Sequence, residues 1–433
     1  MSTNVTTSAL TTPAVIVGAN ADGLGIARSL GRAGVPVILA DSDVRRPGMH
    51  SRYACPFVLT AMSGPGLIDG LLALRGTLDA RPVLFVTSDL QVRSVSESRE
   101  RLEKAFRIRL PNHQSVCDLL DKRGFQRVAE GHGFPVPRAI TIREEKDINK
   151  LAKLRYPAVI KPPNKEYFTT LRALTVTSRE QAATVCRSIL ASVPELIVQE
   201  WIGGRESEIY FCLQYRGVDG LTVSSFTGRK LRSWPPQTGS TASCVAAPEM
   251  EETLEPLTRA FFDKTGFVGM CSMEFKRDER DGNLFMIEPT VGRTDWQEEV
   301  AVINGVNIPL AAYRYELGLP QLGAQSPPVP QIWMYPPSLW RSMLATKSFR
   351  DRRPAGARVK SACWCPDDPV PLAFFLREWI RDVWSPARWR EFMFARGKLM
   401  TSCQSNATGH PTTGAGPSLP ATEAPCITPE PRP

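Results

Sequence analysis

The stretch that best indicates the fold of this chain is Met270-Cys-Ser-Met-Glu-Phe-Lys-Arg-Asp-Glu-Arg-Asp-Gly-Asn-Leu-Phe-Met-Ile-Glu-Pro-Thr290. Its two ends are rich in apolar residues, and its charged middle carries the turn pair Asp281-Gly282. Two apolar runs joined by such a turn predict a β-hairpin. With the loop centred on Asp281, Glu274 and Glu288 lie directly opposite one another, with Cβ atoms about 5 Å apart.

The two opposed carboxylates predict a cation site. Like charges at that separation repel one another unless positive charge lies between them, and a divalent cation with oxygen ligands supplies that charge. Thr290 follows Glu288 on the same face of the strand and offers a hydroxyl oxygen. The alternative is an exposed hairpin with two solvated carboxylates, because the register of a hairpin is not observable in its sequence.

The composition is that of a globular protein without a membrane span. The 433 residues suffice for about two to four domains, with 42% hydrophobic and 22% charged residues. The net charge of +9 favours anionic ligands such as nucleotides, whereas no basic run interleaved with aromatic residues marks a nucleic-acid surface. No apolar run reaches the roughly 20 residues of a membrane span, and residues 1–12 lack the layout of a signal peptide. The ten cysteines have no zinc-site spacing and are typical of reduced thiols, so we expect a cytoplasmic protein.

The N-terminal pattern predicts the beginning of a parallel α/β sheet. Apolar strands at 14–18 and 35–41 flank a helix at 23–33. The turn between the first strand and the helix, 18–25, has the spacing GxxxxGxG, and Asp41 ends the second strand. A bound dinucleotide pyrophosphate requires GxGxxG, so a nicotinamide or flavin site competes here with a purely structural turn.

Two lysines and a strand end in the middle of the chain carry further signals. Lys122 lies on a helical pattern at 114–130, and Lys161 leaves an apolar strand just before two prolines. Another apolar strand, 196–202, carries Gln199 and Glu200 near its end and stops at a pair of glycines. Taken alone, the lysine at the strand exit is equally compatible with a solvated strand end.

In this order, the features resemble the ATP-grasp superfamily, and more narrowly the carboxylate–amine ligases related to D-aspartate ligase. The resemblance extends over about 13–318. It is carried by Phe85-Val-Thr-Ser-Asp89, Asp121-Lys-Arg-Gly-Phe125, Gly133-Phe-Pro-Val-Pro137, Val198-Gln-Glu-Trp-Ile-Gly203, Glu208-Ile-Tyr-Phe-Cys212, Thr227-Gly-Arg-Lys-Leu-Arg232 and Glu288-Pro-Thr-Val-Gly-Arg293.

The resemblance implies a mixed α/β and α+β architecture. A Rossmann-like pre-ATP-grasp domain is expected at 13–113, followed by an ATP-grasp domain at 114–320 with subdomains at about 114–195 and 196–320. Residues 1–12 and 401–433 are expected to be disordered, the latter because it lacks aromatic residues and is rich in Pro, Ser, Thr and Ala. Residues 321–400 form a Trp-rich extension.

The resemblance also implies a ligase that uses ATP and Mg²⁺. Its substrates are a small-molecule carboxylate, which is converted to an acyl phosphate, and an amine, which attacks to form an amide. The implied site falls into three groups. The nucleotide would be bound by Lys122, Lys161, Glu200, Trp201, Ile202 and Glu208. The metal ions would be bound by Glu274, Glu288 and Thr290. The carboxylate and its acyl phosphate would be stabilised by Arg293, with Lys230 and Arg232 as further candidates.

Two departures from the family pattern keep other functions open. The family usually has Asn where this chain has Thr290, whose hydroxyl is a weaker metal ligand than an amide oxygen. The loop after Lys161 has no glycine, although a lid that closes backbone amides over phosphates normally uses glycines. The alternatives are a nicotinamide- or flavin-linked oxidoreductase and a non-catalytic ATP-binding scaffold.

The C-terminal extension has a pattern of its own. Residues 374–394 combine Trp, Phe and Arg as in an amphipathic helix, interrupted by Pro386. Such a segment either packs against the main body, which we expect, or makes weak contact with a membrane surface.

Overall fold

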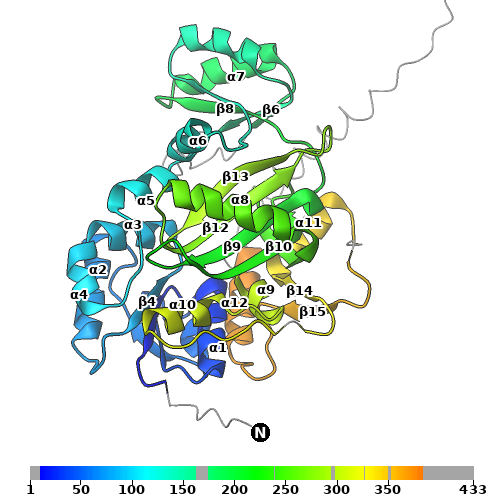
Figure 1. Cartoon of the computed structure of the whole chain (residues 1–433). Helices are drawn as coiled ribbons and strands as arrows, with labels where there is room; N and C mark the ends of the chain where they lie inside the picture. The colour runs from blue at the N-terminus through cyan, green and yellow to red at the C-terminus, as the bar shows by residue number, and fades with distance from the viewer. Residues whose placement is uncertain are drawn as a thin grey trace, which may run out of the picture.

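The structure is a computed structural model that describes residues 10–161, 174–237, 239–293, 298–325, 327–349 and 353–383. Figure 1 shows a four-stranded sheet and its helices in blue and cyan, a large green and yellow sheet, and a smaller unit at the top. None of the helices within the described residues has the length and apolar content needed to cross a membrane.

The N-terminal sheet is parallel and has the strand order β3-β2-β1-β4. Helix α1 packs on one face, over Ile16, and helices α2 and α3 pack on the other, over Val15 and Val17. This is the doubly wound arrangement that the sequence predicts. The elements are β1 (Ala14–Val17), α1 (Ala21–Arg32), β2 (Val37–Asp41), β3 (Cys55–Val58), α2 (Gly64–Arg75), β4 (Val83–Val86), α3 (Asp89–Glu97) and α4 (Arg99–Ala105).

The glycine-rich turn before α1 serves the fold itself. Gly18 has a φ of +101°, and a Cβ there would lie 2.1 Å from Thr87 Oγ1. A Cβ on Gly23 would lie 1.8 Å from the carbonyl oxygen of Gly18. Asp41 is buried and accepts hydrogen bonds from the backbone N–H groups of Ala19 (2.8 Å) and Asp43 (3.0 Å). The turn and its acidic partner therefore have structural roles that need no dinucleotide.

The smaller unit contains an antiparallel sheet with the order β5-β8-β6-β7, covered by α7. The helical pattern at 114–130 is two helices rather than one, because Asp121 ends α5 and accepts N–H bonds from Arg123 and Gly124 as the N-cap of α6. Lys122 is thereby the first residue of α6. The elements are α5 (His113–Leu120), α6 (Lys122–Gly131), β5 (Ala139–Ile142), β6 (Ala158–Lys161), β7 (Leu174–Val176), α7 (Arg179–Leu190) and β8 (Leu196–Glu200).

The large sheet has seven strands in the order β13-β12-β9-β10-β11-β14-β15. Its last two strands come from beyond residue 320, so the C-terminal extension completes this sheet. The division at 320 stays a prediction about domains, but it does not separate two sheets. The elements are β9 (Ile209–Arg216), β10 (Thr222–Trp234), β11 (Ser240–Ala246), α8 (Glu251–Lys264), β12 (Gly269–Arg277), β13 (Leu284–Val291), α9 (Glu298–Ile303), α10 (Ile308–Glu316), β14 (Gln331–Met334), α11 (Pro336–Thr346), β15 (Arg358–Ser361) and α12 (Pro371–Val383).

The end of the described chain is tied to the N-terminal domain by a buried ion pair. Arg28 on α1 donates from Nε to Asp368 (2.9 Å), and both side chains are 1% exposed. Asp368 also accepts from the hydroxyl of Ser51 and the backbone N–H of Arg52. Helix α12 follows and packs against residues 47–50. The first half of the expected amphipathic segment thus contacts the main body, and residues 384–394 lie outside the described ranges.

We predict that Asp368→Ala destabilises the protein by about 3–5 kcal/mol, because it leaves the buried Arg28 guanidinium without its carboxylate. Chemical denaturation monitored by circular dichroism measures the change. The control is Asp69→Asn, which breaks the exposed Arg101–Asp69 pair and should cost less than about 1 kcal/mol. Equal losses in both variants would contradict the structural role of the buried pair.

Candidate active site

The predicted opposition of Glu274 and Glu288 on the β12–β13 hairpin is confirmed, whereas the predicted register is wrong by one residue between this pair and the turn. Glu274 pairs with Glu288, and Ser272 pairs with Thr290, which places all four side chains on one face. A β-bulge follows directly, because the next pair is Phe275 with Met286. The two carboxylates therefore face one another across neighbouring strands.

Lys230 on β10 supplies positive charge to this face. Its Nζ lies 2.6 Å from Glu274 Oε2, and its side chain is 5% exposed against 26% for Glu274. The ion pair offsets part of the hydration that the buried ammonium group loses. Glu288, by contrast, is exposed.

Lys161, the last residue of β6, extends the group of charges. Its Nζ donates to Gln199 Oε1 on the adjacent strand β8 (2.9 Å). Its pKa is lowered to about 8, chiefly by burial and also by the charge of Lys122, while the charges of Glu288 and Glu274 act in the opposite direction. These mutual effects mean that the two predicted lysines and the two predicted carboxylates converge on one region, although they come from four different elements.

The end of strand β8 is held by the small unit. Glu200 is buried, and its carboxylate accepts hydrogen bonds from the backbone N–H (3.0 Å) and Nε (3.2 Å) of Arg155. The backbone N–H of Trp201 donates to Pro157 (3.0 Å), and the Ile202 side chain is buried. The Glu200 side chain thus fixes the end of β8. Since its carboxylate is occupied by Arg155, residues 200–202 would contact a ligand through their backbone groups.

Two charged residues that the sequence analysis missed lie beside this strand end. Lys276 is 5% exposed, and its Nζ donates to the carbonyl of Gly204 (3.0 Å) and lies 5.9 Å from the centre of the Trp201 ring. Burial lowers its pKa. Glu206 accepts from the backbone N–H groups of Ser233 and Gln237, both at 2.9 Å, and burial raises its pKa. The sequence could have indicated Lys276, because it lies two residues after Glu274 on the same strand and therefore on the same face of the sheet.

Glu208, the predicted ribose ligand, lies at the start of β9. Its carboxylate accepts a hydrogen bond from the hydroxyl of Tyr210 (3.4 Å) and lies 3.7 Å from a guanidinium nitrogen of Arg277. It remains part-exposed, so its oxygens have room for a further donor.

The two arginines proposed for the carboxylate substrate have protein partners. Arg232 is 5% exposed and donates to Thr346 (3.1 Å) and to the carbonyl of Ser348 (2.9 Å), beside the C-terminal end of α11. Arg293 donates from Nε to Asp89 Oδ1 (2.8 Å), at the N-terminus of α3. Arg293 thus connects the end of β13 to the N-terminal sheet, whereas Arg232 holds α11 on the large sheet.

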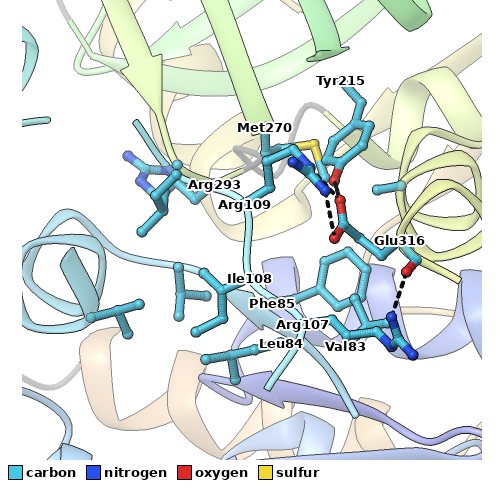
Figure 2. Close-up of a pocket in the computed structure, with 15 residues that line it drawn as sticks. Val83, Leu84, Phe85, Arg107, Ile108, Arg109, Tyr215, Met270, Arg293 and Glu316 are labelled. Atoms are coloured by element: carbon cyan, nitrogen blue, oxygen red, sulfur yellow. Dashed lines mark hydrogen bonds and ion pairs between the residues drawn. The ribbon is translucent and has the colours of Figure 1, made fainter. Parts of the chain in front are cut away.

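A small cavity of about 40 Å³ lies between the N-terminal sheet and the large sheet, near Arg293. Figure 2 shows Arg109 and Tyr215 directed at the carboxylate of Glu316, with Arg293 apart from this group on the left. A volume of this size holds water molecules but no organic substrate. The glycine-free loop after Lys161 lies outside the described residues.

The comparisons with known proteins concern the fold. No family model and no curated protein matches this sequence. Among solved structures, an N5-carboxyaminoimidazole ribonucleotide synthetase in complex with ADP has a TM-score of 0.57 and 16% identity, over 74% of this chain and 80% of that one. The N5-carboxyaminoimidazole synthetase of Staphylococcus aureus has a TM-score of 0.59 and 15% identity, over 75% and 82%. Phosphoribosylglycinamide synthetase of Anaerococcus prevotii has a TM-score of 0.54 and 15% identity, over 71% and 76%.

The chain has an ATP-grasp fold. The predicted fold class, a Rossmann-like N-terminal sheet followed by the ATP-grasp architecture, is confirmed. The similarity to the first of these structures covers 74% of the chain.

We predict that Lys161 titrates with a pKa of about 8 in the nucleotide-free protein and that Lys122→Met raises this pKa by removing a like charge. NMR titration of labelled lysine side chains measures both values. Because the folded-state pKa lies below the ordinary 10.5, the contribution of Lys161 to stability decreases as the pH falls from 10.5 to about 8 and is constant below that.

The control for this titration is Lys104→Met, which removes an exposed lysine on α4. An unchanged Lys161 pKa in Lys122→Met, together with the same result in the control, would show that the two lysines do not share a site.

Proposed function

We propose that this protein is an ATP- and Mg²⁺-dependent ligase that joins a small-molecule carboxylate to an amine through an acyl phosphate. The observation that carries the proposal is the convergence of Lys122, Lys161, Glu274 and Glu288 within an ATP-grasp fold. Cations for phosphate oxygens and opposed carboxylates for divalent ions are the groups that phosphoryl transfer requires.

The nucleotide is expected along the end of β8 and the exit of β6. Lys122 and Lys161 act as compact charges on phosphate oxygens, and the depressed pKa of Lys161 rises when those oxygens arrive. The backbone of 200–202 contacts the adenine edge, and Glu208 bonds the ribose. Structures that share this fold contain ADP or ATP, which supports the assignment.

The residues of the hairpin fit Mg²⁺. The ion prefers oxygen ligands, and Glu274, Glu288 and Thr290 present oxygens on one face of the sheet. Bound there with ATP, Mg²⁺ would offset the charge on the phosphates. The ion pair with Lys230 orients the Glu274 carboxylate before any ligand binds.

The carboxylate substrate and its acyl phosphate are expected near Lys230 and Arg293. Phosphoryl transfer to a carboxylate oxygen of the substrate forms the acyl phosphate and releases ADP. Attack of the amine then forms the C–N bond and releases phosphate. Lys230 contacts Glu274, and Arg293 lies at the carboxyl edge of the N-terminal sheet; these positions support a role for both in stabilising anionic substrate oxygens. Arg232 is bonded to Ser348 beside α11, so its proposed role at the substrate requires it to leave this partner.

We further propose the domain division at 13–113 and 114–320, and a cytoplasmic location. The free cysteines within the described residues support a reducing compartment. A second candidate function, a nucleotide-binding scaffold without catalysis, is favoured by Thr290 in place of the stronger amide ligand.

The experiment that tests the function is a screen for ADP release with paired libraries of carboxylates and amines. We expect release that requires one member of each library together with Mg²⁺. Tight ATP binding with no turnover over the whole screen would favour the scaffold instead.

We predict that Glu288→Gln lowers turnover by about 10²- to 10³-fold, because it removes charge that holds the metal ion at the phosphates. ADP binding measured by calorimetry without Mg²⁺ should change little. The control is Asp281→Asn at the exposed tip of the same hairpin, which should retain full activity.

We also predict that Thr290→Asn lowers the Mg²⁺ concentration needed for half-maximal activity, because an amide oxygen is a stronger ligand than a hydroxyl. Magnesium titration of turnover at saturating ATP measures this. A higher magnesium requirement in Thr290→Asn would place Thr290 outside the metal site.

A further inference from the structure

A second group of carboxylates lies away from the hairpin, at the first residues of α9. Glu298 is 2% exposed, and its Oε1 has no hydrogen-bond partner among the described residues. A buried carboxylate oxygen without a donor carries a desolvation cost that a binding partner removes. Glu298 therefore differs from Glu200, Glu206 and Glu274, whose carboxylates have the partners described above.

The neighbouring Glu299 is also buried, but its carboxylate has a hydrogen-bond donor. Its Oε2 accepts a hydrogen bond from the indole N–H of Trp333 (2.7 Å). Burial raises the pKa of Glu299, while this hydrogen bond and the charges of Arg28 and Arg32 act in the opposite direction. The charges that act on Glu298 belong to Glu299 and Asp22 and are both negative, so with burial they raise the pKa of Glu298 well above its usual range. Among the described residues, no positive charge therefore offsets the buried Glu298 carboxylate.

The position of Glu298 in the fold is one where ligands bind. Strands β1 and β4 are parallel neighbours, and their following helices α1 and α3 cover opposite faces of the sheet. The carboxyl ends of such strands form a crevice at the topological switch point. Asp22 lies in the first turn of α1 on one side of this point, and Asp89, the partner of Arg293, begins α3 on the other.

Helix α9 is close to this edge of the sheet. A Cβ on Gly25 of α1 would lie 3.6 Å from Glu299 Cβ, which shows how closely the two helices pack. The end of β13 reaches the same edge, since a Cβ on Gly292 would lie 2.7 Å from Val92 on α3. One side of the edge therefore carries the cationic Arg293, and the other carries the unpartnered Glu298.

We infer that Glu298 binds the protonated amino group of the amine co-substrate, at the edge of the N-terminal sheet formed by β1 and β4. The inference rests on the proposed ligase function and names the class of the second substrate as a primary amine that arrives as an ammonium ion. An ammonium group offers three N–H donors and one positive charge, which complement the unpartnered Glu298 oxygen. Before the nitrogen attacks, the ammonium group loses one proton, for which the Glu298 carboxylate is the acceptor, and this frees the nitrogen lone pair. A metal ion fits less well at Glu298, because no group of three His, Cys, Asp or Glu side chains that could hold one is found among the described residues.

The test separates carboxylate activation from amine binding. Hydroxylamine, which is largely uncharged at neutral pH, traps acyl phosphates as hydroxamates and needs no ammonium site. A carboxylate that gives ATP-dependent hydroxamate with the wild-type protein is then assayed for amide formation with ammonium chloride, methylamine and the twenty amino acids. Hydroxamate without amide from any of these amines would overturn the inference while leaving the proposed function intact.

For Glu298→Gln we expect hydroxamate formation within about twofold of wild type and a rise of about 10- to 100-fold in the KM for the amine, as loss of a charge-assisted hydrogen bond implies. The KM for the carboxylate should not change. The matched control is Glu299→Gln, in which the amide oxygen still accepts from Trp333, so the amine KM should stay within about twofold.

The remaining outcomes are also decisive. An unchanged amine KM in Glu298→Gln, or an equal rise in both variants, would overturn the inference. A loss of hydroxamate formation in Glu298→Gln while ADP still binds would do the same, because the role would then not be specific to the amine. Absence of hydroxamate from the wild-type protein with every carboxylate would instead contradict the proposed function, on which the inference depends.

Discussion

The electrostatic repulsion between Glu274 and Glu288 is the constraint around which the site is built. The two carboxylates face one another across paired strands, which is stable only when positive charge is near. The protein supplies part of that charge through Lys230 and brings Lys161 close from another sheet. The same arrangement suits a nucleotide with its metal ions, since cations and phosphates then alternate with the carboxylates. A hairpin with solvated carboxylates would need none of these buried lysines.

The N-terminal domain shows how the fold accommodates the glycine turn without a dinucleotide. Close contacts within the turn require glycine at Gly18 and Gly23, and the Asp41 carboxylate accepts hydrogen bonds from two backbone N–H groups. The residues that suggested an oxidoreductase therefore have structural roles and no longer support that alternative. What this domain contributes instead is an edge, at the ends of β1 and β4, against which the chain after β13 packs.

Local patterns predicted much of this structure, and distant contacts account for what they missed. The turn pair Asp281-Gly282 between two apolar runs predicted the hairpin. The opposition of the carboxylates also depends on the bulge, which local sequence did not reveal, because Phe275 pairs with Met286 and only the extra residue Ile287 brings Glu274 opposite Glu288. The partners of Arg232 and Arg293 lie 116 and 204 residues away, and no spacing signals them. The break at Asp121 depends on a side-chain cap within one helical pattern. Composition also could not reveal that β14 and β15 complete the large sheet, because strand pairing depends on tertiary structure.

The central claim is that the opposed carboxylates hold metal ions at the phosphates of a bound nucleotide. Its most direct test is a crystal structure with ADP and Mn²⁺, in which anomalous scattering locates the metal. We predict a manganese peak in contact with both Glu274 and Glu288, with phosphate oxygens beside it and Lys161 in reach of them. A nucleotide bound at the turn 18–25, or manganese away from the two glutamates, would contradict the account.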